Sequence, residues 1–153
     1  MKFLIGLTIV SCLAIGQAMA GGSEIVAAAR TQIGVPYSWG GGGWSGKSRG
    51  IQQGAHTVGF DCSGLAQYSV YHGTHKKIAR VASAQYHDHQ CHHVPYAQHQ
   101  PGDLVFFAKG SDIHHVAIIS GHNTMIEAPH TGAKVHETSV RAAERMANVA
   151  RCF

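Results

Sequence analysis

The spacing of apolar residues changes along the chain from a helical pattern to an extended one. Behind Ser23, a residue type that often caps helices, alanine and aliphatic residues predict a helix to about Ile33. Asp61 is a second N-cap candidate, and the apolar spacing that follows it predicts a helix over about residues 62–73. A short third helix is expected over residues 83–87.

The second half of the chain has the pattern of strands. Residues 104–107 are an apolar run of strand length that follows a Pro-Gly turn. Residues 116–120 and 124–128 flank Gly-His-Asn and predict a β-hairpin. The remaining expected elements are a strand, a short helix and a closing strand over residues 135–138, 139–146 and 148–153. Helices followed by adjacent strands indicate an α+β domain rather than alternating βαβ units.

Residues 39–59 lie between the first two predicted helices and are dense in glycine. Connections of this length in compact domains are usually functional or disordered. We expect a long surface loop here, with a hairpin as the alternative.

The first residues have the pattern of a secretory signal peptide. One positive charge precedes the apolar residues 3–15, and Ala-Met-Ala at 18–20 fits a cleavage site. The apolar run is too short for a membrane span. Removing 20 of the 153 residues leaves 133, enough for one domain with a core and too few for two. We therefore predict a signal peptide over residues 1–20 and one secreted domain, extracellular or periplasmic, over residues 21–153.

Charge and histidine content restrict the partners. The formal charge is +4 at pH 7, or +3 without Lys2, which suits an anionic surface such as a bacterial envelope. Lys and Arg are scattered rather than clustered with aromatic residues, so we expect no nucleic-acid partner. Four of the thirteen histidines crowd residues 87–93 without a second ligand pair at zinc-finger spacing. We accordingly expect no metal and no other cofactor, and a monomeric protein.

Three cysteines remain after signal removal: Cys62, Cys91 and Cys152. An odd count in an oxidising compartment leaves one thiol unpaired. Cys91 lies in the polar histidine-rich segment and Cys152 beside the C-terminus, so a Cys91–Cys152 disulfide would close a long loop and contribute ~2–4 kcal/mol. Cys62 is then the free thiol, and a structural disulfide at Cys62 is the alternative.

The position of Cys62 favours a nucleophile. The Asp61 cap places it in the first helical turn, where unpaired N–H groups and the helix dipole favour a thiolate. The same N–H groups, near Cys62 and Ser63, could hold an oxyanion.

A base and its orienting group are expected from the predicted hairpin. His115 stands at the start of one strand, and its neighbour His114 must point the opposite way. Glu127 lies in the partner strand near the level of His115, which gives a nucleophile–base–orienter arrangement with Cys62. His130 is the competing orienter, and a solvated strand carboxylate is the alternative for Glu127.

Four ordered motifs resemble the NlpC/P60 family of papain-like cell-wall cysteine peptidases. The resemblance covers nearly the whole mature chain, and the motifs are GVPYSWGG at 34–41, GFDCSG at 59–64, PGDLVFF at 101–107 and HVAI at 115–118. It implies a papain-like domain with N-terminal helices packed on an antiparallel β-sheet. The implied activity is cleavage of peptidoglycan stem peptides, typically between γ-D-glutamate and the following diamino acid.

The resemblance also implies residue roles. Cys62 matches the nucleophile, His115 the general base, and Glu127 the position of the polar residue that orients the histidine. Further matches are Tyr37 for a site tyrosine that helps to hold the oxyanion, and Asp61 and Ser63 for contacts to the D-glutamyl portion. The chain departs from the family pattern in its longer segment after Trp39 and in Ala117, where many members have glycine.

The sequence thus predicts a secreted cysteine endopeptidase acting on peptidoglycan or muropeptides. It would either remodel its own organism's wall or attack other bacteria. Two alternatives remain: a non-catalytic wall-binding or histidine-rich metal-binding domain, and a papain-like amidase or acyltransferase with another substrate.

Overall fold

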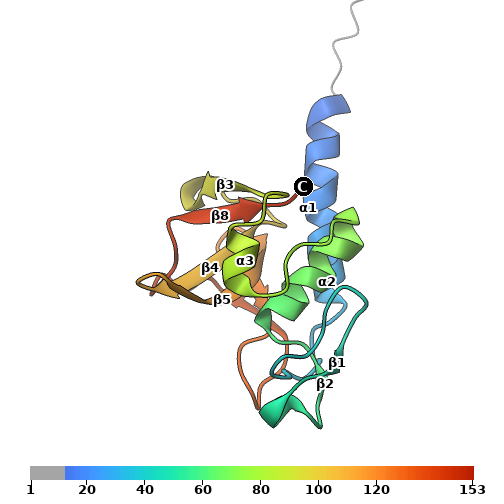
Figure 1. The fold of residues 1–153 in the computed structure, drawn as a ribbon. Coiled ribbons are helices and arrows are strands. Elements are labelled where there is room, and N and C mark those ends of the chain that lie inside the picture. Colours follow the sequence, from blue (N-terminus) through green and yellow to red (C-terminus); the bar gives the residue numbers. More distant parts are fainter. Residues whose placement is uncertain (1–12) are drawn as a thin grey trace, which may run out of the picture.

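A six-stranded antiparallel sheet lies beside two helices in the computed structural model, which describes residues 13–153 (Figure 1). The strand order is β3-β8-β4-β5-β6-β7, and β1 pairs with β2 in a separate small sheet. The predicted α+β arrangement, helices first and strands afterwards, is confirmed. The elements are α1 (Leu13–Arg30), β1 (Ser48–Arg49), the 3-10 helix η1 (Gln52–Gly54), β2 (Val58–Gly59), α2 (Cys62–Thr74), α3 (Ala82–Tyr86), β3 (His92–Pro95), the 3-10 helix η2 (Tyr96–Gln98), β4 (Leu104–Lys109), β5 (Asp112–Gly121), β6 (Thr124–Glu127), β7 (His136–Ser139) and β8 (Asn148–Arg151).

The central strands β4 and β5 are buried on both faces of the sheet. One set of alternating side chains packs against α1 and α2, namely Leu104, Phe106, Val116 and Ile118. The intervening set forms a second cluster on the other face, namely Val105, Phe107, Ala117 and Ile119. This double burial explains why both strands have nearly continuous apolar sequences.

Helix α1 packs closely along α2. A Cβ atom on Gly73 would lie 2.6 Å from the backbone nitrogen of Ile25, so glycine permits the close approach of the two helices. The predicted start at Ser23 is wrong, because α1 begins at Leu13 and runs through that position. Leu, Ala, Gln and Met before Ser23 favour helix, which lets it continue through two glycines.

The predicted signal peptide is only partly within the described residues. Residues 1–12 lie outside them, and α1 crosses the predicted cleavage position after residue 20 without a break. The signal peptide and its boundary therefore stay predictions. Among residues 13–153, no helix is both long and apolar enough to cross a bilayer.

The glycine-rich segment is folded rather than open. β1 and β2 pair antiparallel within it, so the hairpin alternative describes it better than a plain loop. The buried Ser38 hydroxyl is 3.1 Å from the Gly54 carbonyl and 2.7 Å from the Thr57 carbonyl. These contacts tie the second half of the segment to the residue that precedes it. The segment lies at the end of the domain opposite to β3 and β8 (Figure 1).

Two expectations for the C-terminal half need correction. Residues 139–146 form no helix, because their backbone bonds elsewhere: the N–H of Ala108 donates to the Glu144 carbonyl and the N–H of Met146 to the Phe106 carbonyl. Glu144 also has a φ of 61°, which a helix does not allow. The second correction concerns β3, which pairs with β8 although the pattern of the polar histidine-rich segment predicts no strand there. The β5–β6 hairpin is confirmed, with Asn123 at a φ of 56° in its turn.

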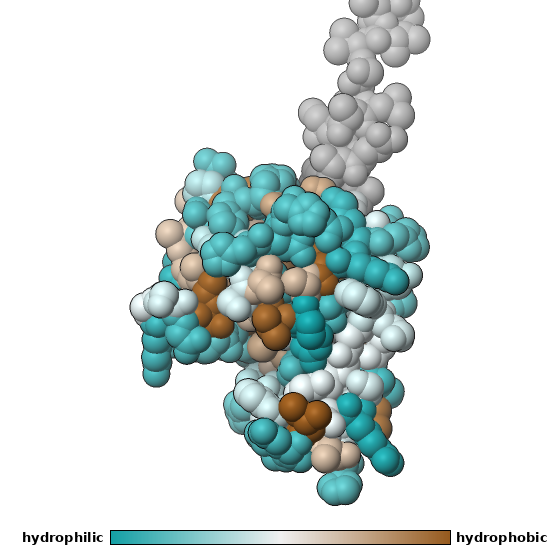
Figure 2. Space-filling view, viewed as in Figure 1, coloured by the Kyte–Doolittle hydropathy of each residue, from teal (hydrophilic) through white to brown (hydrophobic). Residues whose placement is uncertain are grey.

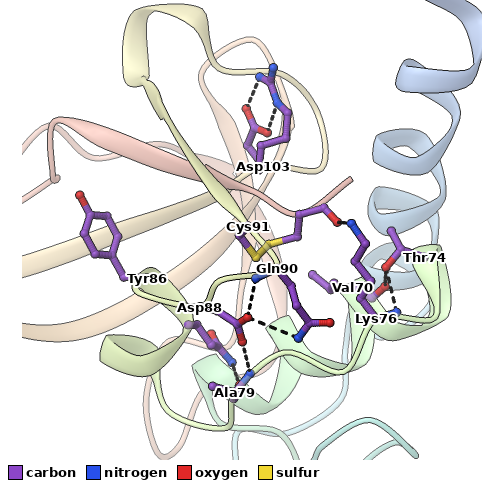
Figure 3. Close-up of a disulfide and its surroundings, with 12 residues drawn as sticks. Val70, Thr74, Lys76, Ala79, Tyr86, Asp88, Gln90, Cys91 and Asp103 are labelled. Atoms are coloured by element: carbon purple, nitrogen blue, oxygen red, sulfur yellow. Dashed lines mark hydrogen bonds and ion pairs between the residues drawn. A yellow bond between two sulfur atoms is a disulfide. The ribbon is translucent and has the colours of Figure 1, made fainter. Parts of the chain in front are cut away.

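A disulfide joins Cys91 to Cys152, as the cysteine count predicts, and ties the chain end to the segment after α3 (Figure 3). Cys152 also accepts a hydrogen bond from Lys76 on its backbone oxygen at 3.0 Å. Nearby, Asp88 accepts from the N–H groups of Ala79 and Gln90. The disulfide therefore stabilises the same region that leads from α2 to α3.

Candidate active site

A cavity of about 940 Å³ lies where the glycine-rich segment, the start of α2, the segment leading into α3 and the sheet meet. The space-filling view shows the surface hollowed above the lower lobe that carries β1 and β2, with apolar side chains exposed around it (Figure 2). Most residues predicted for the site line this cavity: Tyr37, Asp61, Cys62, Ser63, His115 and His130. Glu127 lies behind His115 and is almost completely buried.

Cys62 is the first residue of α2 and the one free cysteine among the described residues. Asp61 caps the helix as predicted, because its Oδ1 accepts from the N–H of Gly64 at 2.7 Å. The thiol is also close to the backbone N–H groups of Val116 and Ser63. This contact places the sulfur beside the strand residue that follows His115.

Burial opposes ionisation of the thiol. Burial is the main cause that raises the pKa of Cys62 to about 11, and the charge of Asp61 adds to it. The two backbone N–H groups and the guanidinium of Arg80 act in the opposite direction and are outweighed. The N–H groups at the helix start act in the expected direction, toward the thiolate, and desolvation of the thiol opposes them.

His115 and Glu127 form the predicted pair. The Nε2 atom of His115 is 2.8 Å from Oε1 of Glu127, and the side chains are 9% and 2% exposed. Since Nε2 is bonded to the carboxylate, Nδ1 is the ring nitrogen that remains for a reacting group. His114 instead lies 2.8 Å from Glu144. His130 contacts the backbone oxygen of Thr131 in its own loop, so Glu127 is the partner of His115 in this structure.

Glu127 has two further partners that the sequence did not suggest. Arg141 donates to both carboxylate oxygens, at 3.1 and 3.0 Å, and Nε2 of His136 is 2.8 Å from Oε2. Burial alone would raise the pKa of Glu127, but the hydrogen bonds from His115, Arg141 and His136 bring it well below its usual range. Glu127 is consequently a carboxylate at neutral pH.

Arg80 also lines the cavity, and the sequence did not suggest it. Its guanidinium donates to both oxygens of Asp61, at 2.8 and 3.0 Å, and to the Ser63 hydroxyl at 2.7 Å. It also reaches the Gly41 carbonyl at 3.1 Å. No local pattern marks Arg80 in the sequence, because its partners lie 17 or more positions away.

Tyr37 is buried and lines the cavity. Burial is the first cause that raises its pKa, followed by the charges of Cys62 and Asp61, so its hydroxyl keeps its proton at neutral pH.

The histidine-rich segment near α3 makes structural contacts. His93 contacts the Tyr86 carbonyl at 2.7 Å, and among residues 13–153 no group of three or more His, Cys, Asp or Glu gathers in a metal-binding arrangement.

Comparison with known proteins gives a consistent result. A model described as the NlpC/P60 family matches residues 34–151. The chain is 45% identical over 111 residues to the peptidoglycan endopeptidase RipA of Mycolicibacterium smegmatis, covering 72% of this chain and 22% of RipA. It is 43% identical over 119 residues to the peptidoglycan endopeptidase RipB of Mycobacterium tuberculosis, covering 78% of this chain and 48% of RipB. The chain thus spans between about a fifth and a half of these relatives.

Solved structures show the same fold. RipA structures mutated at a cysteine, a histidine or a glutamate each superpose with a TM-score of 0.82 and 36% identity, covering 94% of this chain and 67–68% of theirs. RipD of Mycobacterium tuberculosis superposes with a TM-score of 0.78 and 34% identity, covering 87% of this chain and 98% of RipD. RipD is described as a non-catalytic NlpC/P60 domain protein adapted to peptidoglycan binding.

Proposed function

Because the chain belongs to the NlpC/P60 family, we propose that it is a cysteine endopeptidase that hydrolyses peptidoglycan stem peptides. The observation that carries the proposal is the placement of Cys62 and His115 on one cavity, with Glu127 holding the imidazole at 2.8 Å. The proposed bond is the one between γ-D-glutamate and the following diamino acid, as the family resemblance implies.

In the proposed reaction, Nδ1 of His115 takes the proton of Cys62 while the sulfur forms a bond to the substrate carbonyl carbon. The protonated ring then gives this proton to the leaving amine. The same ring next activates a water molecule, which releases the acyl group from sulfur. We propose that this proton transfer accompanies substrate binding, in keeping with the burial that raises the pKa of Cys62 to about 11.

The remaining residues have proposed roles around this step. The N–H groups at the start of α2, together with the protonated hydroxyl of Tyr37, hold the oxyanion. Asp61 and Ser63, both bonded to Arg80, contact the D-glutamyl portion of the stem. This wall of the cavity is fixed before substrate arrives, which favours precise placement of the carbonyl.

The comparison with RipA supports the residue assignment. The histidine and glutamate mutated in RipA are 12 positions apart, the same separation as between His115 and Glu127. The disulfide supports an extracytoplasmic location, since such bonds persist in oxidising compartments. We propose secretion on the same basis, with the predicted signal peptide as the means of export.

A non-catalytic wall-binding domain, like RipD, is the second candidate. The observation in its favour is the fold shared with RipD, at 34% identity and a TM-score of 0.78. The two candidates differ in turnover rather than in affinity for the wall.

The test is incubation of purified protein with muropeptides, followed by mass spectrometry of the products. Wild-type protein is expected to release fragments split after γ-D-glutamate, and Cys62→Ala is expected to bind muropeptides without cutting them. Equal turnover by Cys62→Ala would contradict the assigned nucleophile. Binding by both proteins without any product would instead support the wall-binding candidate.

A further inference from the structure

The carboxylate that holds His115 is itself held by a guanidinium. We propose that Arg141 is a positioning residue, which locks Glu127 in the orientation and charge that His115 requires. This inference rests on the proposed cysteine peptidase function. Neither the sequence pattern nor the family resemblance assigned a role to Arg141.

The contacts define the lock. Arg141 places one nitrogen on each carboxylate oxygen, at 3.1 and 3.0 Å, so the carboxylate cannot rotate without losing a bond. His136 takes a further position on Oε2, and His115 one on Oε1. Every oxygen of Glu127 therefore has two donors, and only His115 among these three partners is proposed to change its protonation during a turnover.

The charge of Arg141 matters for the same reason. Glu127 is 2% exposed, and a buried carboxylate without a cation tends to take up a proton. In the proposed reaction, His115 alternates between a neutral and a charged ring, while His136 is half-exposed to solvent. Arg141 is permanently charged and keeps Glu127 ionised throughout the cycle.

The fold gives Arg141 a fixed position. Its guanidinium lies over the ring of Phe107, 4.6 Å from the centroid, and the centroid of the same ring is 5.6 Å from that of His115. Phe107 therefore contacts two of the three side chains that bind Glu127, Arg141 and His115. Residues 140–146 form irregular backbone with a turn at Ala143 and Glu144, which is bonded to Phe106 and Ala108 of β4 instead of forming a helix, and this path brings Arg141 to the site.

Arg145 provides a matched control. It lies four positions later in the same segment, and its guanidinium stacks over the ring of Tyr96 at 3.7 Å. The experiment compares Arg141→Ala, Arg141→Lys and Arg145→Ala with wild type. For each protein it measures kcat and KM on a purified muropeptide, the pH dependence of kcat, and the thermal midpoint.

Arg141→Ala is expected to lower kcat by about 10- to 100-fold with KM changed less than about threefold. This is the loss typical of removing a residue that orients a metal ligand, which is a comparable positioning role. The acid limb of its pH profile should move to higher pH, because Glu127 loses a donor that keeps it ionised. Free guanidinium ion, added at concentrations that leave wild type unaffected, should restore part of the rate. Arg141→Lys should fall between wild type and Arg141→Ala, and Arg145→Ala should remain within about twofold of wild type.

Other outcomes would overturn the inference. A kcat within twofold of wild type in Arg141→Ala would remove the positioning role. A raised KM at unchanged kcat would make Arg141 a substrate contact instead. A lowered thermal midpoint with no guanidinium rescue and no shift in the pH profile would make it purely structural.

A further measurement does not depend on turnover. The proton between His115 and Glu127 should give a downfield NMR signal in wild type and Arg145→Ala, and Arg141→Ala should broaden or lose it. If wild type cuts no muropeptide, the proposed function fails, while this signal still decides whether Arg141 orders the pair. An unchanged signal in Arg141→Ala would count against the lock whatever the substrate is.

Discussion

Among residues 13–153, two buried carboxylates, Asp103 and Glu127, are each bound by an arginine, and of the two only Glu127 contacts a histidine that lines the cavity. Asp103, which is fully buried, binds Arg151 through both oxygens at 2.8 Å and accepts from the N–H of Gln100 at 2.7 Å (Figure 3). Glu127 binds Arg141 in a similar fork and, in addition, the ring of His115.

The difference lies in the partners that each carboxylate has besides its arginine. Asp103 accepts its other hydrogen bond from a backbone N–H in the turn before β4. Its pair with Arg151 therefore joins β8 to that turn and stabilises the sheet. Glu127 instead binds the ring of His115, which lines the cavity. A carboxylate–arginine fork therefore indicates a rigid point in the fold, and its other partner decides whether that rigidity serves stability or chemistry.

The sharpest way to break this comparison is to neutralise each carboxylate in turn. Glu127→Gln should lower kcat by about 10²- to 10⁴-fold, because the amide presents a different hydrogen-bonding face to His115. Asp103→Asn should instead cost about 3–5 kcal/mol in the free energy of unfolding, since Arg151 is left without a charge partner. The measurements are muropeptide cleavage and denaturant unfolding on both variants. Similar losses of kcat and of stability in the two variants would show that the partners besides the arginine do not decide what each carboxylate does.

The disulfide tests whether the Asp103 end of the molecule is structural only. Cys152→Ser should reduce the free energy of unfolding by about 2–5 kcal/mol, because the closed loop between Cys91 and Cys152 is released. At temperatures where the variant remains folded, cleavage should stay within a few-fold of wild type. Unfolding curves and kinetics under the same conditions check both statements. A kcat that falls as far as in Glu127→Gln would show coupling between the two ends.

Two carboxylate–arginine pairs lie at the candidate site, and their acidic residues could be found in the sequence more readily than their arginines. Asp61 stands in a capping position and Glu127 in a strand next to apolar residues, so local rules pointed to both. Arg80 and Arg141 carry no such signal. Each arginine reaches its carboxylate because it lies in an irregular segment, and the course of such segments cannot be predicted from the periodicity of apolar residues.

The elements show the same division. The second helix and its cap, and the β5–β6 hairpin, follow from local spacing and turn chemistry. The absence of a helix over residues 139–146 does not, because bonds to Phe106 and Ala108 on β4 override the local propensity. β3 was missed for a related reason, since its pairing with β8 joins segments far apart in the chain.

A smaller effect is expected where Asp61 and Ser63 line the cavity. Arg80→Ala should lower kcat/KM for muropeptides by about tenfold, because Asp61 and Ser63 lose the group that fixes them. Arg49, an exposed arginine on β1, offers a control whose change to alanine should have little effect. The check is steady-state kinetics on the two variants. An unchanged kcat/KM in Arg80→Ala would reduce its pairing with Asp61 to a surface contact.

The smallest expected effect concerns the thiol itself. Burial and the charge of Asp61 raise the pKa of Cys62 to about 11, whereas Arg80 acts to lower it. Alkylation of native protein by iodoacetamide should therefore be slow at pH 7 and rise through pH 9. Asp61→Asn, which can still cap the helix, should react a few times faster than wild type at pH 8, and Arg80→Ala should react more slowly. Reaction rates are read from the mass of the intact protein over time. Rapid alkylation of wild type at pH 5–6 would mean that His115 already holds the thiol proton at rest, and the proton transfer proposed to accompany substrate binding would then precede it.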